Sequence, residues 1–590
     1  MKWLAQINTP SDLRSLPIEA LPELAADLRA RIIEVVSANG GHLGASLGAV
    51  ELTLALHYCL DTPRDLLVWD VGHQTYAHKI ISGRNTDFTS LRKYKGMSPF
   101  PKRSESPFDT FGTGHSSTSI SAAFGMATAS ALKGDTNRLH IAVIGDASLA
   151  SGMAFEALNH LAETQANVLI VLNDNNMGID KATGALRHHL QKIYQGDSAF
   201  FKALGLSYHG PVDGHDLDAL TSALNAQKSI NGPRVLHVRT IKGKGLATAE
   251  ADQVTYHAPG KFEPKTGERT EGAAALAYQD IFSKCLEELF ERHSSLVAVT
   301  PAMLSGSGLL SLKSRFNSRV FDVGIAEQHA VSFSAGLATQ GLLPICALYS
   351  TFAQRAYDQI IHDVALQELP VIFAIDRAGL VGADGPTHHG VFDIAYLRAI
   401  PSIEIFAPID AQELVDLIHT LVLKFENKKL LQPVAIRYPR GSSGLTVHPT
   451  PKEINPYVLR KLGTLESSLN KVALISTGAI AEELSQVTQL PDGVDHFHCL
   501  AIKPLDSSGL ESIFEKYQAL VILEDAAVNA SFGSAIVSLA QELGHSLSIE
   551  CLGIPDRFIT HGSVGALREE IGLDATAIVK RLQQALDRVM

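Results

Sequence analysis

Cysteine is scarce in this sequence and follows no pairing pattern. The chain has five cysteines in 590 residues, and none stands in a Cys-x-x-Cys spacing. Disulfide frameworks and zinc sites normally show closely spaced cysteines in even numbers. Scattered thiols are typical of a reducing compartment, so we expect a cytoplasmic protein. The positions are Cys59, Cys285, Cys346, Cys499 and Cys551.

The sequence also lacks long apolar runs and an excess of basic charge. No apolar run reaches the roughly 18 residues of a membrane-spanning helix, and Met1–Gln6 turns polar too soon for a signal peptide. Asp and Glu number 62 against 50 Lys and Arg, a net charge of -12. Nucleic acids and anionic membranes require a basic surface, so we expect neither as a partner.

The composition that remains is typical of a multidomain α/β protein. The chain is 45% hydrophobic and contains 46 glycines, as expected for strands and helices joined by many turns. Two polar stretches, 259–272 and 442–457, have the composition of interdomain linkers. They predict domains at 1–258, 273–441 and 458–590, in line with the number expected for this length.

Two apolar segments in the first domain have the pattern of adjacent parallel strands. Leu139–Ile144 and Val168–Leu172 are almost wholly apolar, and Met153–Ala166 between them is predicted to be helical. Parallel strands joined by a crossover helix end at the same edge of a sheet. Because open α/β sheets bind ligands at that edge, we expect a site at the ends of these two strands.

Oxygen ligands follow both predicted strands. Asp146 offers a carboxylate, Asn175 an amide oxygen and the turn at Met177 a backbone carbonyl. This set suits Mg²⁺, which is usually held by a few protein oxygens together with the phosphates of its ligand. Asp and Asn at strand ends also cap helices and turns, and neither residue alone decides between the two interpretations.

The whole pattern is more specific than its parts. Gly145-Asp146-Ala147, a crossover helix and Asn173-Asp174-Asn175 are similar to the signature of thiamine diphosphate enzymes, which holds Mg²⁺ and the diphosphate. The third position of that signature is usually glycine, and here it is Ala147. Its methyl group would crowd a diphosphate, or would fit if the backbone φ is negative.

Three Gly-His pairs stand at predicted turns in the first 120 residues, at Gly41-His42, Gly72-His73 and Gly114-His115. The last continues into Ser116-Ser117, directly before a predicted helix at 120–132. Small residues, hydroxyls and a helix start suit an anion. The three imidazoles are predicted to surround one anionic cofactor or intermediate. A zinc site is the competing interpretation, but no His-x-x-x-His or paired-cysteine spacing supports it.

Four sequence motifs together closely resemble the 1-deoxy-D-xylulose-5-phosphate synthase family of transketolase relatives. They are Gly40-Gly-His-Leu-Gly-Ala-Ser46, Trp69-Asp-Val-Gly-His-Gln74, Gly114-His-Ser-Ser-Thr-Ser119 and Gly210-Pro-Val-Asp-Gly-His-Asp216. The resemblance spans nearly the whole chain. It implies three doubly wound α/β domains of the transketolase type. The first would bind the diphosphate with Mg²⁺, the second would bind the pyrimidine, and the third would support a homodimer.

The resemblance also implies an activity. A thiamine diphosphate and Mg²⁺ dependent transferase of this family decarboxylates pyruvate and joins the two-carbon unit to D-glyceraldehyde 3-phosphate, giving 1-deoxy-D-xylulose 5-phosphate and CO₂. This is the first step of non-mevalonate isoprenoid synthesis and also feeds thiamine and pyridoxal synthesis. Two alternatives stay open, a transketolase acting on sugar phosphates and a non-catalytic paralogue that keeps the fold for binding or regulation.

By the same resemblance, residues of the first domain surround the reacting centre and the diphosphate. His42 and His73 would act in catalysis, with Ser46 and His257 at the substrates. Mg²⁺ would be bound by Asp146, Asn175 and Met177. The cofactor would be bound by His73, Gly114, His115, Ser116, Ser117, Gly145, Asp146, Ala147, Asn175 and Lys242.

Glu327 is the main candidate of the second domain. A predicted strand, Arg319–Val323, leads into Gly324-Ile-Ala-Glu327-Gln-His-Ala330 at the start of a helix that ends near Thr339. A carboxylate in the first turn often simply complements the helix dipole. The resemblance makes Glu327 the catalytic, cofactor-activating glutamate, which binds N1′ of the aminopyrimidine and prepares the cofactor for proton loss. Phe352 would face the pyrimidine ring, with Arg355 nearby.

Arginines follow a predicted buried strand, Val371–Asp376, and end the domain at Arg437–Gly441. Arginine suits a planar, bidentate hold on phosphate, although each alone is also typical of a surface ion pair. The resemblance assigns the phosphate of glyceraldehyde 3-phosphate to Tyr349, Arg377 and Arg440. It assigns sugar contacts or proton transfer to Asp384 and His388, with His388 in a catalytic role.

Two regions carry weaker signals. Arg187–Leu204 is shorter than the corresponding segment usually is in the family, and long loops near active sites commonly act as lids. The third domain, with predicted strands at 472–476, 496–500 and 519–523 and a helix at 534–542, has no catalytic cluster. Lys503–Asp506 and Glu524-Asp525 are predicted to be turns and caps.

Overall fold

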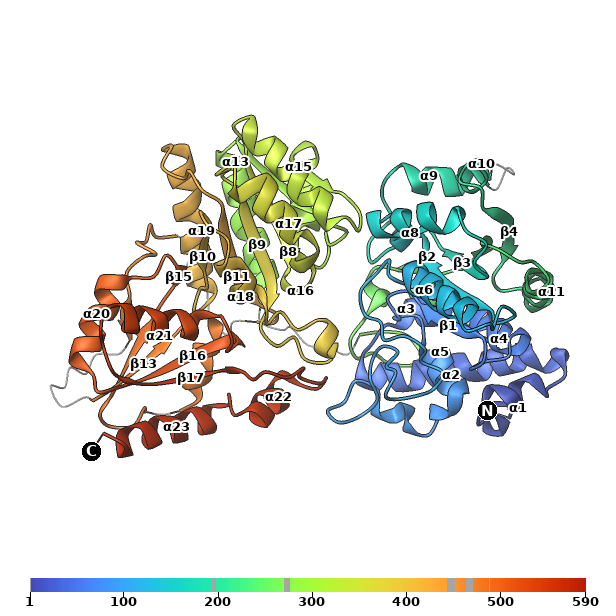
Figure 1. Ribbon diagram of the computed structural model, residues 1–590, viewed down its shortest axis with the longest axis horizontal. Helices are drawn as coiled ribbons and strands as arrows, with labels where there is room; N and C mark the ends of the chain where they lie inside the picture. Colours follow the sequence, from blue (N-terminus) through green and yellow to red (C-terminus); the bar gives the residue numbers. More distant parts are fainter. Residues whose placement is uncertain are drawn as a thin grey trace. The chain divides into compact units, whose positions relative to one another are not determined.

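The computed structural model describes residues 2–193, 198–269, 276–442, 451–462, 471–487 and 489–589. The chain forms two compact units (Figure 1). The N-terminal unit comprises Met1–Ala273 with Gly324–Ala326, and the C-terminal unit comprises Ala274–Val323 with Glu327–Met590. Half of the predicted linker at 442–457 and the end of that at 259–272 lie outside the described residues.

The N-terminal unit is built on a five-stranded parallel sheet in the order β1-β2-β3-β5-β4. The central strands are buried on both faces, which explains their continuous apolar sequence. One face packs against α6 and α8 through residues such as Ile120 and Leu158, and the other against α4 and α11 through residues such as Leu56 and Leu224. The strands are β1 (Leu66–Trp69), β2 (His140–Gly145), β3 (Val168–Asp174), β4 (Ser207–Asp213) and β5 (Arg234–Arg239).

The helices of this unit follow the predicted order with some changed bounds. Helix α3 begins at Leu43, so His42 is its N-cap, and a break at Ala49 separates α3 from α4. The helices are α1 (Pro10–Arg14), α2 (Leu21–Asn39), α3 (Leu43–Gly48), α4 (Val50–Cys59), α5 (Tyr76–Lys79), α6 (Ser119–Leu132), α7 (Asp146–Leu149), α8 (Gly152–Ala162), α9 (Ala185–Lys192), α10 (Ala199–Ala203), α11 (Leu217–Lys228) and α12 (Ala247–Ala251).

The C-terminal unit contains two sheets. A seven-stranded sheet has the order β15-β10-β11-β9-β8-β6-β7, and a five-stranded sheet has the order β12-β14-β13-β16-β17. The strands are β6 (Leu296–Thr300), β7 (Val320–Asp322), β8 (Leu343–Tyr349), β9 (Ile372–Ala378), β10 (Glu404–Phe406), β11 (Val434–Pro439), β12 (Arg460–Leu462), β13 (Val472–Ser476), β14 (Val494–His498), β15 (Ala501–Lys503), β16 (Ala519–Ala527) and β17 (Ser548–Ile554).

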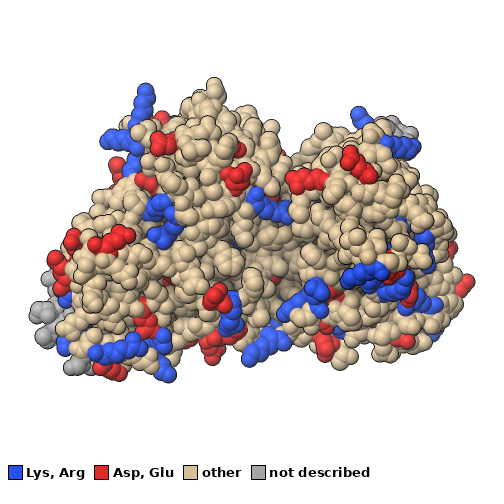
Figure 2. Space-filling view, in the orientation of Figure 1, with Lys and Arg blue, Asp and Glu red and all other residues tan. Residues whose placement is uncertain are grey.

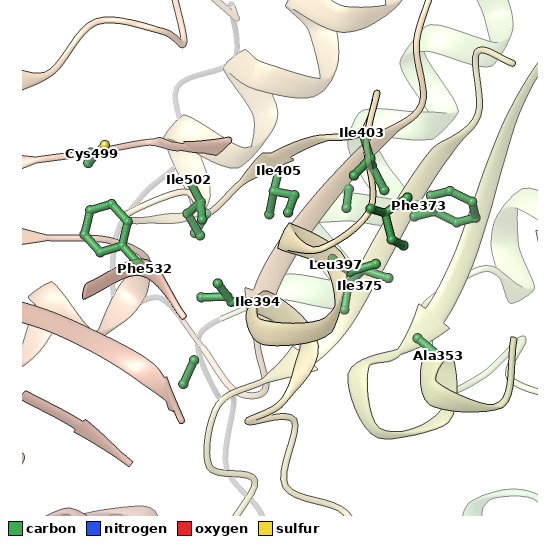
Figure 3. Packing of buried hydrophobic residues seen from close by; sticks show 14 of the residues in the cluster. Ala353, Phe373, Ile375, Ile394, Leu397, Ile403, Ile405, Cys499, Ile502 and Phe532 are labelled. Carbon is green, nitrogen blue, oxygen red and sulfur yellow. The ribbon is translucent and has the colours of Figure 1, made fainter. Parts of the chain in front are cut away.

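The two sheets of the C-terminal unit share one hydrophobic core. Phe373 and Ile405 of the seven-stranded sheet (Figure 3) belong to the same buried cluster as Ile475 and Ile522 of the five-stranded sheet. Strand β15 pairs antiparallel with β10, so the last part of the chain adds a strand to the preceding sheet. This shared core joins the segment after 458 to the sheet that carries the candidate site.

Helices cover the sheets of the C-terminal unit, and α13 packs against α19. The bounds are α13 (Tyr278–Arg292), α14 (Leu310–Arg315), α15 (Glu327–Thr339), α16 (Ser350–Ala353), α17 (Tyr357–Gln359), α18 (Asp393–Arg398), α19 (Ala411–Glu426), α20 (Ser507–Lys516), α21 (Phe532–Glu542), α22 (Val564–Ile571) and α23 (Ala575–Asp587).

One predicted turn is a buried strand. Glu524 and Asp525 are buried inside β16, where other groups of the protein bind both carboxyl groups. Asp525 forms an ion pair with Arg437, and Glu524 accepts hydrogen bonds from the N–H groups of Phe532 and Gly533. Asp506 does cap a helix, as predicted, by accepting a hydrogen bond from the Gly509 N–H.

Surface charge and helix hydropathy agree with the composition. On the face drawn in Figure 2, basic and acidic side chains are interspersed among neutral ones. Within the described ranges, no helix combines the length and the apolar character that crossing a membrane requires.

Candidate active site

The predicted strand ends meet at one edge of the N-terminal sheet. Strands β2 and β3 are parallel neighbours, and Gly145 is in register with Asn173. Asp146 begins α7 directly after Gly145, and Asn175 follows β3. The predicted strand arrangement is therefore confirmed, and it brings the Asp146 carboxyl group and the Asn175 turn to the same edge.

Burial makes Asp146 difficult to ionise. The residue is 6% exposed. Burial, helped by the nearby Asp174 carboxylate, raises the pKa of Asp146 to about 8, and the backbone N–H groups of Ala147 and Asn175 oppose the shift. A bound cation would favour the ionised form and so reverse this balance.

The turn after β3 is held by its own side chains. Asn175 Oδ1 accepts a hydrogen bond from the Met177 N–H at 3.1 Å, and Asp174 Oδ1 accepts one from the Asn176 N–H at 3.2 Å. Among the described residues, no group of three or more His, Cys, Asp or Glu side chains is placed to hold a metal ion. A metal at this edge would therefore need amide or backbone oxygens, such as those of Asn175 and Met177.

Ala147 meets the condition under which its methyl group fits. It is the second residue of α7 and lies outside the left-handed region of φ. A helical backbone is open to any L-residue, so replacing the family's glycine by alanine causes no backbone strain here.

Lys242 lies beside the same turn. Its Nζ donates a hydrogen bond to the Gly178 carbonyl at 2.7 Å. Burial lowers the pKa of Lys242 to about 8, opposed by Asp180 and Asp146. His215, from the Gly210–Asp216 motif, accepts a hydrogen bond from the Ile241 N–H at 2.8 Å. That motif therefore orients the loop that carries Lys242.

Three histidines from separate segments form one cluster. The ring centroid of His42 lies 6.1 Å from that of His73 and 5.5 Å from that of His257, and the rings of His73 and His257 are 5.7 Å apart. Burial, with a smaller contribution from Lys242, lowers the pKa of His73 to about 4. His73 is therefore neutral near pH 7, and a neutral imidazole can both donate and accept a hydrogen bond. Phe100, which the sequence analysis missed, packs against His42 with centroids 5.4 Å apart.

Asp70 is a second residue that the sequence analysis missed. It is 1% exposed, and its carboxylate accepts hydrogen bonds from the N–H groups of Ser117 at 2.7 Å and Ser119 at 3.1 Å. Ser117 has a left-handed φ of 71°, and its hydroxyl donates to the Ser148 carbonyl at 2.8 Å. The available signal was the place of Asp70 directly after a strand, the same signal that singled out Asp146.

The remaining predicted residues of this unit differ in exposure, and Ser46 is fully buried in α3. His115 and Ser116 are half-buried, whereas Gly114 is buried. The Ser46 hydroxyl donates a hydrogen bond to the His73 backbone carbonyl at 3.0 Å. Ser46 therefore helps to hold the histidine turn.

In the C-terminal unit, Glu327 is a buried carboxyl group at the first position of α15. It is 4% exposed, and burial raises its pKa, although Arg355 opposes the shift. Arg355 Nη1 lies 3.8 Å from Glu327 Oε2. Among the described residues, Oε2 has no hydrogen-bond partner. Such an oxygen can bind a nitrogen of a ligand.

An aromatic and cationic cluster follows the ends of β8 and β9. The rings of Tyr349 and Phe352 are stacked, with centroids 5.7 Å apart and an interplanar angle of 11°. The Arg377 guanidinium lies 4.1 Å from the centre of the Tyr349 ring. Arg377 has a left-handed φ of 58°, and its N–H donates to Asp376 Oδ1 at 2.6 Å. Burial raises the pKa of Asp376 to about 7, and the two nearby arginines, Arg377 and Arg440, oppose it.

The loop after β9 brings further predicted residues to this cluster. The ring of His388 lies 5.7 Å from that of Phe352, and its Nδ1 is 2.8 Å from the Thr387 hydroxyl. Arg440 Nη1 lies 3.6 Å from Asp384 Oδ2. The cluster thus combines two carboxyl groups, an imidazole and two guanidinium groups. Asp376 went unnoticed in the sequence because it looked like the last residue of a buried strand.

Family models match most of the chain. The model described as 1-deoxy-D-xylulose-5-phosphate synthase matches residues 4–199 and 195–240. The transketolase pyrimidine-binding domain matches residues 274–444, and the transketolase C-terminal domain matches residues 464–578.

Curated relatives match over nearly the full length. The chain is 45% identical to a 1-deoxy-D-xylulose-5-phosphate synthase of Cytophaga hutchinsonii over 98% of each chain. It is 43% identical to one of Nitrosomonas europaea, over 98% of this chain and 99% of that one. Among solved structures, it is similar to a transketolase of Campylobacter jejuni, with 18% identity, a TM-score of 0.43, and coverage of 96% of this chain and 100% of that one. The chain belongs to the 1-deoxy-D-xylulose-5-phosphate synthase family.

Proposed function

We propose that the chain catalyses the reaction for which its family is named. It decarboxylates pyruvate and joins the two-carbon unit to D-glyceraldehyde 3-phosphate, giving 1-deoxy-D-xylulose 5-phosphate and CO₂, the first step of non-mevalonate isoprenoid synthesis. The observation that carries the proposal is Glu327, whose buried Oε2 has no hydrogen-bond partner among the described residues. The family's chemistry requires a carboxyl group of this kind at a nitrogen of thiamine diphosphate.

The residues present fit thiamine diphosphate and Mg²⁺. Glu327 Oε2 would bind the aminopyrimidine, with Phe352 against its ring. Asp146, Asn175 and the Met177 carbonyl would bind Mg²⁺, because all three are oxygen donors. Lys242 would add positive charge near the diphosphate. The pKa of Asp146, which burial raises to about 8, supports a cation here, since an unpaired buried carboxylate is costly.

The protein's own groups would divide the remaining work. Bound thiamine diphosphate supplies the electron sink for decarboxylation. Glu327 would hold and release a proton at the aminopyrimidine N1′, a role suited to a carboxyl group whose pKa burial has raised. The neutral His73, with His42 and His257, would exchange hydrogen bonds with substrate oxygens without adding charge.

Two guanidinium groups would bind the acceptor phosphate. Arg377 is held over Tyr349, and Arg440 lies near Asp384. Arginine keeps its charge when buried and can grip phosphate with two donors. Asp384 and His388 would then contact the hydroxyl and carbonyl oxygens of the aldehyde.

The deciding experiment is CO₂ release from pyruvate with thiamine diphosphate and Mg²⁺, with and without glyceraldehyde 3-phosphate. We expect release that depends on the aldehyde phosphate and is lost in Glu327→Ala. Turnover of sugar phosphates without CO₂ release from pyruvate would instead indicate a transketolase. Cofactor binding without any turnover would indicate a binding protein.

Assembly and compartment are part of the same proposal. The chain would form a homodimer in the cytoplasm, as its family resemblance implies. The five cysteines support a reducing compartment, because all five lie within described segments and are free thiols. Analytical ultracentrifugation at micromolar concentration tests the dimer.

A further inference from the structure

The loop that carries Asp384 and His388 has its two ends joined by backbone hydrogen bonds, and the residues between the ends pack against other parts of the C-terminal unit. We call Gly379–Gly390 the acceptor loop. Two backbone hydrogen bonds close it, from the Gly379 N–H to the Gly390 carbonyl at 2.7 Å and from the Gly390 N–H to the Gly379 carbonyl at 2.8 Å. These bonds fix the two ends, but the position of the residues between them depends on what the loop packs against.

The loop packs against the last part of the chain. A side-chain carbon placed on Gly385 would lie 3.0 Å from the His561 Cβ, and one on Gly379 would lie 2.5 Å from Asp525 Oδ2. Both glycines have positive φ, of 72° and 74°. Asp525 is itself held by Arg437, which also binds Asp393 at 3.0 Å. The Asp525 side chain that Gly379 approaches is therefore held in place by its own ion pair.

His389 joins the loop to the segment before α22. Its Nδ1 accepts a hydrogen bond from the Val381 N–H at 3.1 Å, within the loop. Its Nε2 lies 3.1 Å from the Thr560 carbonyl, outside the loop. Because a backbone N–H can only donate, Nδ1 must carry no proton, and Nε2 must carry one to donate to Thr560. Burial lowers the pKa of His389, which favours this neutral form.

We propose that His389 is a positioning residue, which ties the acceptor loop to the Thr560 carbonyl and thereby sets the affinity for the acceptor aldehyde phosphate. The inference rests on the proposed function, because it takes Asp384, His388 and Arg440 as acceptor contacts. It gives the C-terminal segment a part in substrate binding, beyond the supporting role that the sequence suggested. His389 itself need not touch the substrate.

Two variants separate the two hydrogen bonds of His389. His389→Asn keeps an acceptor near the Nδ1 position for Val381 and removes the donor to Thr560. His389→Gln keeps a donor near the Nε2 position and removes the acceptor for Val381. We expect His389→Asn to raise KM for glyceraldehyde 3-phosphate about fivefold, the effect of one lost hydrogen bond, with a smaller rise in His389→Gln. KM for pyruvate should stay within about twofold in both, since the proposed function assigns the acceptor loop to the aldehyde phosphate alone.

The outcomes are distinct. A wild-type KM in His389→Asn overturns the proposal, and so does an equal rise for both substrates, which would indicate a general structural role. Hydrogen exchange of the wild-type protein gives a test that needs no variant. Glyceraldehyde 3-phosphate should slow exchange in peptides covering both 379–390 and 559–563, and slowing in the first alone overturns the proposal. Failure of the proposed function would show earlier, as wild-type protein that releases no CO₂ from pyruvate.

Discussion

The histidine cluster of the N-terminal unit and the aromatic and cationic cluster of the C-terminal unit differ in the charge of their buried or half-buried polar groups. Burial lowers the pKa of His73 to about 4 and leaves the ring uncharged. Arg377 is half-buried against the Tyr349 ring and keeps its charge, because the guanidinium pKa lies far above any working pH. Residue type thus decides whether a dry environment provides a neutral hydrogen-bonding group or a fixed cation.

A neutral histidine cluster and a charged arginine suit the different chemistry proposed for the two regions. A keto acid losing CO₂ needs oriented donors and acceptors that do not hold the product by charge. A phosphate needs a permanent positive partner. Glu327 departs from a simple division by unit, since it lies in the C-terminal unit and burial raises its pKa as burial does for Asp146.

The substitution with the largest expected effect is at Glu327. Glu327→Gln keeps the shape of a protonated carboxyl group but cannot exchange its proton. We expect kcat to fall about 1,000-fold, within the range for lost acid–base catalysis. Stability should not fall, because no buried charge is created. Steady-state kinetics and thermal unfolding measure both, with Glu291→Gln on the exposed surface as the control. Activity near that of the wild type would mean that a neutral donor suffices.

Arg377→Lys tests the fixed cation. Lysine keeps the charge but loses the planar grip and the stacking on Tyr349. We expect KM for glyceraldehyde 3-phosphate to rise about 30-fold, or about 2 kcal/mol, with KM for pyruvate unchanged. Arg315→Lys, at a position 45% exposed, is the matched control. A variant with unchanged KM for the aldehyde phosphate would remove Arg377 from the phosphate site.

His73→Asn tests the neutral ring through stability. The folded-state pKa of His73, about 4, lies below the unfolded value, so between pH 4 and 6.5 the unfolded chain binds more protons. Stability from this residue is therefore complete above pH 6.5 and is lost as pH falls. Between pH 7 and pH 5 the wild type should lose about 2 kcal/mol more unfolding free energy than His73→Asn, a factor of about 30.

Tryptophan fluorescence measures this difference selectively. Trp3 and Trp69 are the two tryptophans of the chain, and both belong to the N-terminal unit. Urea unfolding followed at these residues therefore reports on the unit that contains His73. His160→Asn, at an exposed position, is the control. Identical pH dependence in the wild type and His73→Asn would show that His73 is not held neutral by burial.

Ala147→Gly should have the smallest effect. The backbone of Ala147 is already helical, so the freedom that glycine adds is not needed. We expect the dissociation constant for thiamine diphosphate, with Mg²⁺, to change by less than about twofold, because no strain is relieved. Isothermal titration measures it. Binding that tightens tenfold would show that the methyl group crowds the diphosphate.

Local sequence patterns predicted the elements that place the site. The apolar runs at 139–144 and 168–172 are β2 and β3 within one or two residues, and they are parallel neighbours as expected. Glu327 begins a helix and Arg377 lies at the end of a buried strand, also as predicted. These features were accessible because helix and strand periodicity depends on neighbours in the chain.

Partners distant in the chain were not accessible in the same way. Glu524 and Asp525 were expected in a turn because they are acidic, yet Arg437 and the start of α21 bring them into the sheet. Nothing local in Asp70 indicates that it binds the backbone of Ser117. Strand β15 joins a sheet formed by an earlier part of the chain. Asp525, Asp70 and β15 each depend on a group more than forty residues away, whereas Glu524 is bound by the start of α21, eight residues further along the chain.

Local patterns in the chain were enough to predict the order of the main strands and helices, the family, and the residue types available for catalysis. Which of those residues are neutral, which are charged, and which hold others in place depends on contacts made in the folded protein. The physical reason is that a pKa and a hydrogen bond depend on burial and on partners in space, whereas periodicity and turn chemistry depend on neighbours in the chain.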